Sequence, residues 1–253
     1  MPAGRIKSCR GLLPVVLLAG LLLTVMACEN HDSATADRLS PEQARGTAVV
    51  RGTVRFAGPP PPRRTLKSEP CHHGQQRTIL DETVIVGPDG GLKNVFVYLE
   101  GGPKVDGRLL PPIVLDQVDC VYVPHAVGVV VGQTLKVRSS DDVYHNTHYT
   151  PRRNPANNFG LVRAGQEREV RFVAPEIFTA RCDVHPWMSA QIGVFDNPFF
   201  AVSRDDGSFE IANLPAGTYT LVAHHELYGE QRQTLTLEAD STHTVQLEYS
   251  PPN

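Results

Sequence analysis

Short runs of alternating apolar and polar residues make up most of the chain beyond residue 45. The runs TAVVRGTVRF (residues 47–56), NVFVYL (94–99) and EVRF (169–172) are three clear examples. A period of two residues is typical of strands that bury one face, and long runs with the 3.6-residue period of a helix are absent. Gly and Pro, with 21 residues of each, separate the runs and supply turns. The pattern predicts an all-β protein.

The N-terminus has a different pattern. Three basic residues precede an apolar run at 11–27, as in a signal peptide. The run ends in Val25-Met26-Ala27-Cys28, which resembles a bacterial lipobox. We therefore expect residues 1–27 to be a signal peptide and Cys28 to carry the lipid that anchors the protein to a membrane. A plain signal peptide or an uncleaved anchor is the alternative. Each of these places the mature chain in the periplasm or on the extracellular face of a bacterium.

Residues 28–45 are polar and show no periodicity, so we interpret them as the lipidated Cys and a tether. The whole chain has a formal net charge of −3, and loss of the basic leader makes the mature chain more acidic. No basic stripe is available to neutralise phosphates, which argues against a nucleic-acid partner.

The five cysteines are expected to differ in their chemical state. Cys9 leaves with the leader, and Cys28 is the predicted lipidation site. In an oxidising compartment Cys71 and Cys120 can form a disulfide, which leaves Cys182 as a free thiol. A free thiol outside the cytoplasm is a liability unless something, such as a metal ion, occupies it.

The stretch Cys182-Asp183-Val184-His185-Pro186-Trp187-Met188 offers three kinds of metal donor within seven residues. Thiolate and thioether sulfur favour Cu(I), and imidazole binds both oxidation states, so the set suits one copper ion that cycles between Cu(I) and Cu(II). A trigonal His₂Cys site with a weak axial Met needs one more imidazole. His145 or His148 could supply it, and Asn146 could orient the ring through hydrogen bonds.

Two motifs together resemble the cupredoxins, the type 1 blue-copper family, and amicyanin most in their spacing. They are His145-Asn146-Thr147-His148, preceded by Gly132-Gln133 and Ser140-Asp141, and Cys182-x-x-His185-x-x-Met188. The resemblance implies a Greek-key β-sandwich in which His145, Cys182 and His185 form the trigonal set and Met188 is the axial ligand. It also implies redox protein partners, with Pro186 and Trp187 as candidate residues of the docking patch. The alternative for Trp187 is a purely structural role as a core residue.

The remaining segments resemble a carboxypeptidase regulatory-like (transthyretin-like) β-sandwich. The residues that carry this resemblance are Val54-x-Phe56-x-Gly58-x-Pro60, Asp205-Asp206-Gly207-Ser208-Phe209 and Leu214-Pro215-Ala216-Gly217-Thr218-Tyr219. We predict a discontinuous second sandwich (46–104 and 198–250) around a cupredoxin domain (105–197). The alternative is two consecutive domains that divide near Asn197.

These features predict a membrane-tethered blue-copper protein that transfers single electrons and is not an enzyme. A copper chaperone or storage protein, or a surface interaction module on a cupredoxin scaffold, is the alternative. The chain has only three Met, two of them in the leader, whereas a chaperone more often has a Met-rich site. The pairs His72-His73 and His224-His225 are not expected to bind metal, because adjacent strand residues face opposite sides.

Overall fold

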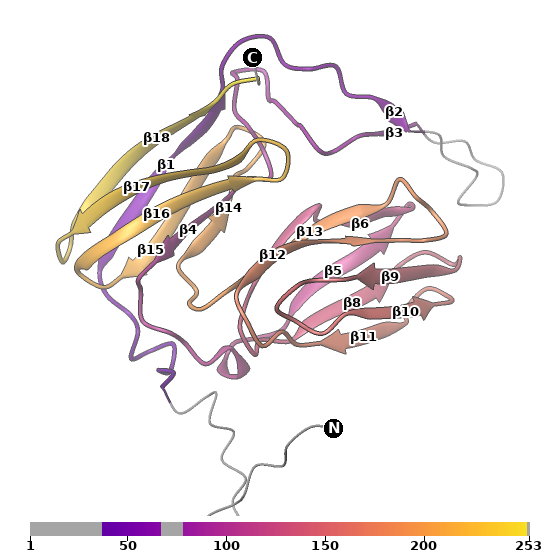
Figure 1. Cartoon of the computed structure of the whole chain (residues 1–253), viewed down its shortest axis with the longest axis horizontal. Coiled ribbons are helices and arrows are strands. Elements are labelled where there is room, and N and C mark those ends of the chain that lie inside the picture. The colour runs from indigo at the N-terminus through magenta and orange to yellow at the C-terminus, as the bar shows by residue number, and fades with distance from the viewer. Residues whose placement is uncertain (1–36, 67–77, 252–253) are drawn as a thin grey trace, which may run out of the picture. The chain divides into compact units, whose positions relative to one another are not determined.

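The computed structural model describes residues 37–66 and 78–251. In these residues almost all regular structure is strand, β1 to β18, and the helical part is a single 3₁₀ turn, η1 (Gly107–Leu109). The all-β prediction is confirmed (Figure 1). No helix in the described ranges is both long enough and apolar enough to cross a membrane. Cys28, Cys71, His72, His73 and the predicted leader lie outside the described residues.

Both ends of the described chain contribute to one pair of sheets, here called the terminal sandwich. Its first sheet has the order β15-β1-β18, with β1 (Ala48–Phe56), β15 (Ser208–Leu214) and β18 (Thr242–Tyr249). Its second sheet has the order β14-β4-β16-β17, with β4 (Phe96–Glu100), β14 (Phe200–Val202), β16 (Gly217–His225) and β17 (Gly229–Leu237). The core is apolar and includes Val50, Val54 and Leu221.

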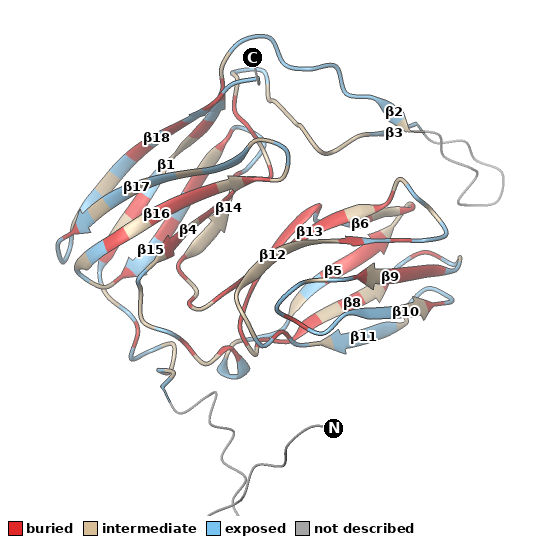
Figure 2. Ribbon diagram, viewed as in Figure 1, coloured by how far each residue is buried: buried red, intermediate tan, exposed pale blue. Residues whose placement is uncertain are grey.

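The strands between β4 and β14 form a second pair of sheets, here called the inserted sandwich. One sheet has the order β10-β9-β12-β13-β7, with β7 (Ala126–Val130), β9 (His145–Tyr149), β10 (Asn157–Leu161), β12 (Glu176–Arg181) and β13 (Ser189–Phe195). The other has the order β11-β8-β5-β6, with β5 (Ile113–Val118), β6 (Val121–Val123), β8 (Leu135–Ser139) and β11 (Glu167–Val170). Figure 2 shows β13 buried and β11 mostly exposed.

Strand pairing makes the terminal sandwich discontinuous in sequence. β1 pairs with β15 and β18, and β4 pairs with β14 and β16, so strands from before and after the insertion share both sheets. Two consecutive domains would not give these pairings. The domain boundaries at 104/105 and 197/198 remain predictions.

Aromatic side chains join the two sandwiches. The Phe195 ring of β13 stacks on Phe200 of β14 at 4.5 Å between centroids and lies edge-on to Phe96 of β4 at 5.8 Å. Gly128 of β7 faces the Phe200 ring so closely that a Cβ there would collide with it. Because Gly128 has no side chain, the Phe200 ring can pack against the backbone of β7. Burial of apolar surface stabilises this contact.

A short hairpin leaves the terminal sandwich between β1 and β4. It consists of β2 (Thr65–Leu66) and β3 (Ile79–Leu80), paired antiparallel. At its base Arg64 donates to the Asp81 carboxylate at 3.0 and 2.5 Å, and the Asp81 amide donates to the Arg64 carbonyl at 2.9 Å. Sequence patterning did not predict this hairpin, since strands of two residues have no detectable period.

Candidate metal centre

Neighbouring strands bring the predicted ligands to one end of the inserted sandwich. His145 begins β9, Cys182 follows the last residue of β12, and the loop 182–188 leads into β13. β9, β12 and β13 are adjacent in one sheet. Two backbone hydrogen bonds close the loop: the Cys182 amide donates to the Met188 carbonyl at 3.2 Å, and the Met188 amide to the His185 carbonyl at 2.8 Å.

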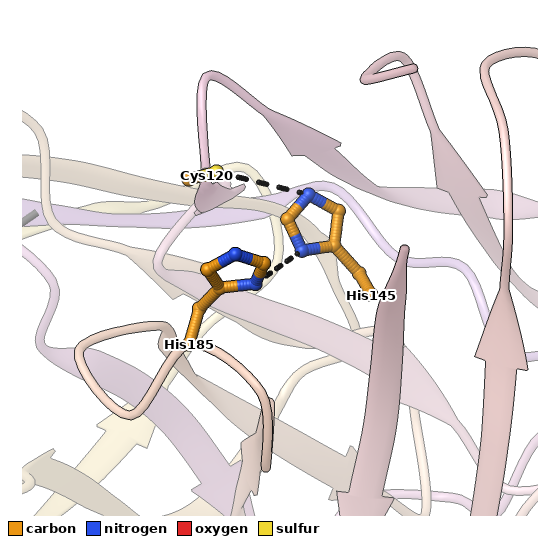
Figure 3. Close-up of side chains that lie close together, drawn as sticks. All are labelled: Cys120, His145 and His185. Carbon is orange, nitrogen blue, oxygen red and sulfur yellow. Dashed lines mark hydrogen bonds between the residues drawn. The ribbon is translucent and has the colours of Figure 1, made fainter. Parts of the chain in front are cut away.

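Three donor atoms converge there. The Nδ1 atoms of His145 and His185 are 3.0 Å apart, and Cys182 Sγ lies 3.7 Å from His185 Nδ1. In Figure 3 the two imidazoles point toward each other. Nitrogens at this separation can both lie about 2 Å from one ion, the usual metal–imidazole distance. Met188 is fully buried in the same apolar cluster as Cys182, next to the site along the loop.

Asp141 orients the His145 ring. Its Oδ2 lies 2.9 Å from His145 Nε2, and its carboxylate also accepts the amides of Asp119 and Cys120 at 2.7 and 2.8 Å. Burial opposes its charge, but the hydrogen bonds with His145 and the amides lower the pKa of Asp141 to about 2. A carboxylate at Nε2 favours the tautomer with its proton there, which leaves the Nδ1 lone pair for a metal. In the sequence Asp141 is only part of the motif before His145, and its position four residues before a candidate ligand is the signal for this orienting role.

The electrostatics favour ligand forms of Cys182 and His185. Burial opposes a thiolate at Cys182, yet hydrogen bonding with His145 and backbone amides lowers its pKa. Burial, and then the charge of His145, lower the pKa of His185, so its neutral ring is favoured. Burial opposes protonation of His145 also, but Asp141 and Cys182 outweigh it and raise its pKa. Thiolate and neutral imidazole are the forms that bind metals, so a metal competes with protons for these ligands.

A second cysteine lies beside the site. Cys120 Sγ is 4.0 Å from His145 Nε2, and the ligand atoms of Cys120, His145 and His185 all lie within 4.8 Å of one another (Figure 3). Cys120 is disulfide-bonded, whereas Cys182 is the free cysteine of the described residues. A disulfide sulfur has no thiolate charge to give a metal, so Cys182 is the better sulfur donor. The predicted Cys71–Cys120 pairing remains a prediction, because Cys71 lies outside the described residues.

Two residues of the loop were predicted to face a partner. Pro186 is exposed, while Trp187 is half-buried. The Trp187 indole donates to the Cys120 carbonyl at 3.0 Å, and its ring lies 5.2 Å from the His185 ring. Trp187 is therefore held against the body of the protein, and the partner role of both residues remains a prediction.

Asn146 joins the two ligand-bearing segments. Its side chain donates to Asp183 Oδ2 at 2.7 Å and accepts the Asp183 amide at 2.7 Å, which links the residue after His145 to the residue after Cys182. His148 directs its Nδ1 to the same carboxylate, at 3.0 Å. His148 is thus held at Asp183, apart from the three converging donors.

The remaining histidine pair on β16 points to opposite sides. His225 is buried, and its Nδ1 accepts the amides of Leu227 and Tyr228 at 3.1 and 3.3 Å. His224 is half-buried, with its Nδ1 3.6 Å from Glu230. Neither belongs to the group of possible metal ligands found in the described residues.

No protein-family model and no curated protein matches the chain. Part of the chain is similar to solved cupredoxin structures. A mutant of amicyanin in its Cu(I) form is 17% identical over 39% of this chain and 97% of its own, with a TM-score of 0.30. A purple cupredoxin from Nitrosopumilus maritimus is 20% identical over 33% of this chain and 98% of its own, with a TM-score of 0.29. A Cu-containing nitrite reductase from Thermus scotoductus SA-01 is also 20% identical over 33% of this chain, with a TM-score of 0.30; the match spans only 22% of that protein's length.

Proposed function

We propose that this protein binds one copper ion at His145, Cys182, His185 and Met188 and transfers single electrons between protein partners outside the cytoplasm. The observation that carries the proposal is the convergence of two imidazole Nδ1 atoms on each other at 3.0 Å and of the Cys182 thiol on His185 at 3.7 Å. The donors match the trigonal His₂Cys set of blue-copper sites, and the buried Met188 suits the weak axial position.

The surroundings of the donors support a site that changes little when it gains or loses an electron. Copper, when bound, supplies the one-electron step between Cu(I) and Cu(II). Asp141 keeps the His145 ring in one orientation, and Asn146 holds the two ligand segments together through Asp183. Ligands that are already held in place need little rearrangement, which favours rapid transfer.

The electron would enter and leave the site through the His185 ring. His145 and Cys182 are buried, whereas His185 is half-buried beside the exposed Val184 and Pro186. A partner that docks on this end of the inserted sandwich would approach the ligand imidazole directly. The lipid on Cys28 would hold the protein at a membrane surface, where such partners are concentrated.

The absorption spectrum of the Cu(II)-loaded protein tests this function. We expect one copper per chain and an intense visible band from charge transfer between the Cys182 thiolate and copper. Cys182→Ser removes the thiolate and should remove the band, whereas Cys120→Ser should retain it. A colourless loaded protein, or colour that survives Cys182→Ser, contradicts the proposal. Reversible one-electron oxidation and reduction of the coloured protein would then separate a carrier from a storage protein.

A further inference from the structure

Two extensions of the terminal sandwich reach the far end of the loop 182–188. The first is the β2–β3 hairpin. Ile79 is buried within the same apolar cluster as Met188, and Leu66 and Trp187 pack against that cluster. A small cavity of about 20 Å³ is lined by Leu66, Ile79, Trp187 and Met188 among others, so little free space separates the hairpin from the loop. Close packing of this kind transmits a change of side-chain volume to neighbouring groups.

The second extension is the turn between β16 and β17. Glu226 Oε1 lies 2.6 Å from His125 Nε2, and Gln191 of the inserted sandwich donates to Glu226 Oε2 at 2.9 Å. The His125 carbonyl also accepts the amide of Gln191, three residues after Met188, at 2.7 Å. His125 is almost fully buried, so its contact with Glu226 is largely sheltered from water and from screening by salt.

The hairpin and the turn between β16 and β17 both lie near the Met188 end of the loop. Leu66 and Ile79 of the hairpin line the same small cavity as Trp187 and Met188, and Glu226 holds His125 and Gln191. The His145 and Cys182 end is held by Asp141 and Asn146 of the inserted sandwich. The terminal sandwich therefore contacts the end of the loop that Asp141 and Asn146 do not hold.

We infer that the terminal sandwich positions the Met188 end of the copper loop, with Ile79 and Glu226 as positioning residues. The inference rests on the proposed copper function. The axial ligand and the apolar surroundings of the Cys sulfur tune the potential and the spectrum of such sites. Contacts that set the place of Met188 consequently tune both, although neither Ile79 nor Glu226 touches the metal.

The test compares Ile79→Ala and Glu226→Gln with two matched controls. Thr65→Ala alters an exposed residue of the same hairpin, and Glu230→Gln alters a carboxylate of the same sandwich that pairs with Arg232. In the copper-loaded protein we expect each positioning variant to shift the reduction potential and the ratio of the visible bands. We expect copper loss to a chelator to be about 10-fold faster or more. The controls should match the unsubstituted protein.

A second readout needs no metal. Trp187 is the only Trp of the chain, so Trp emission, excited at wavelengths where the seven Tyr absorb little, reports on this loop. We expect Ile79→Ala to shift the Trp187 emission of the metal-free protein, and Ile79→Val, which keeps most of the side chain, to restore it. Where Ile79→Ala does not fold, Glu226→Gln carries the comparison.

The two proposals fail in different ways. If the unsubstituted protein shows no thiolate–copper band, the copper function is wrong, and the inference that rests on it is wrong too. If the band is present but folded Ile79→Ala and Glu226→Gln match the controls in potential, band ratio, copper loss and emission, the inference alone is wrong.

Discussion

The two sandwiches bury different kinds of side chain. The terminal sandwich has an apolar interior, and the buried polar residues near it are few: Asn94, Asn197, Ser203 and His225. The inserted sandwich buries a larger polar set that includes Gln117, Ser139, Asp141, His145, Asn146 and Thr147. Buried polar groups lower stability unless they are hydrogen-bonded, and this set is extensively paired. Tyr122, for example, donates to the Asn146 carbonyl at 2.8 Å and lies 3.2 Å from Thr147 Oγ1.

The contrast indicates a division of roles. An apolar interior stabilises the fold but offers few groups that can bind a ligand. A hydrogen-bonded polar interior holds a few side chains in fixed orientations, at some cost in stability. In the inserted sandwich that polar set surrounds the His145 end of the candidate metal centre. The division can be tested by substitutions that should affect stability in one sandwich and metal binding in the other.

The largest effect is expected from the apolar core of the terminal sandwich. Leu221 of β16 is 1% exposed, so Leu221→Ala leaves a cavity and should lower the free energy of unfolding by about 2–5 kcal/mol. While the variant is folded, its copper spectrum should stay unchanged. Urea unfolding and the visible spectrum check this. Leu227→Ala, at a residue that is 59% exposed, is the control and should change stability by less than about 0.5 kcal/mol. A large spectral change in Leu221→Ala would show that the roles are not separate.

The polar network of the inserted sandwich should give the opposite result. Asp141→Asn keeps the side-chain shape but removes the charge that orients His145 through Nε2. Loss of such a partner should weaken copper binding about 10-fold to 100-fold, measured by competition with a chelator. Asp142→Asn changes the exposed neighbouring carboxylate and should leave the affinity unaltered. Equal copper affinities for Asp141→Asn and the unsubstituted protein would show that the Asp141 charge does not support the metal site.

The same contrast explains what the sequence could predict. The alternating runs make the all-β class predictable, because strand faces depend on local pattern. The prediction of a discontinuous sandwich depends instead on the resemblance carried by the segments before and after 105–197. Cys182, His185 and Met188 lie within seven residues, so a shared site could be read from their spacing. The place of Cys120 next to His145 and the β2–β3 hairpin depend on tertiary contacts between segments with no shared period. Local pattern carries no information about such contacts.

The smallest effect is expected where the two sandwiches meet, at the His125–Glu226 pair. Burial disfavours the charged form of His125, but the hydrogen bond and charge of Glu226, together with the charge of Glu82, outweigh it and raise the pKa of His125. The imidazole of His225, whose charge would repel that of His125, has its pKa lowered to about 4, mainly by burial, so it stays neutral near pH 7. A raised pKa in the folded state means that folding favours the protonated ring.

The sign of the pH dependence follows from this shift. The pair should contribute fully below the unfolded-state pKa of His, about 6.5, and its contribution should fall as pH rises through the higher folded-state pKa. The difference in unfolding free energy between the unsubstituted protein and Glu226→Gln should therefore be largest, about 1 kcal/mol, at mildly acidic pH and should shrink in alkaline solution. Urea unfolding across this pH range measures it, with Glu230→Gln as the control. A difference that stays constant or grows with pH would mean that the protonated His125–Glu226 pair does not stabilise the folded protein.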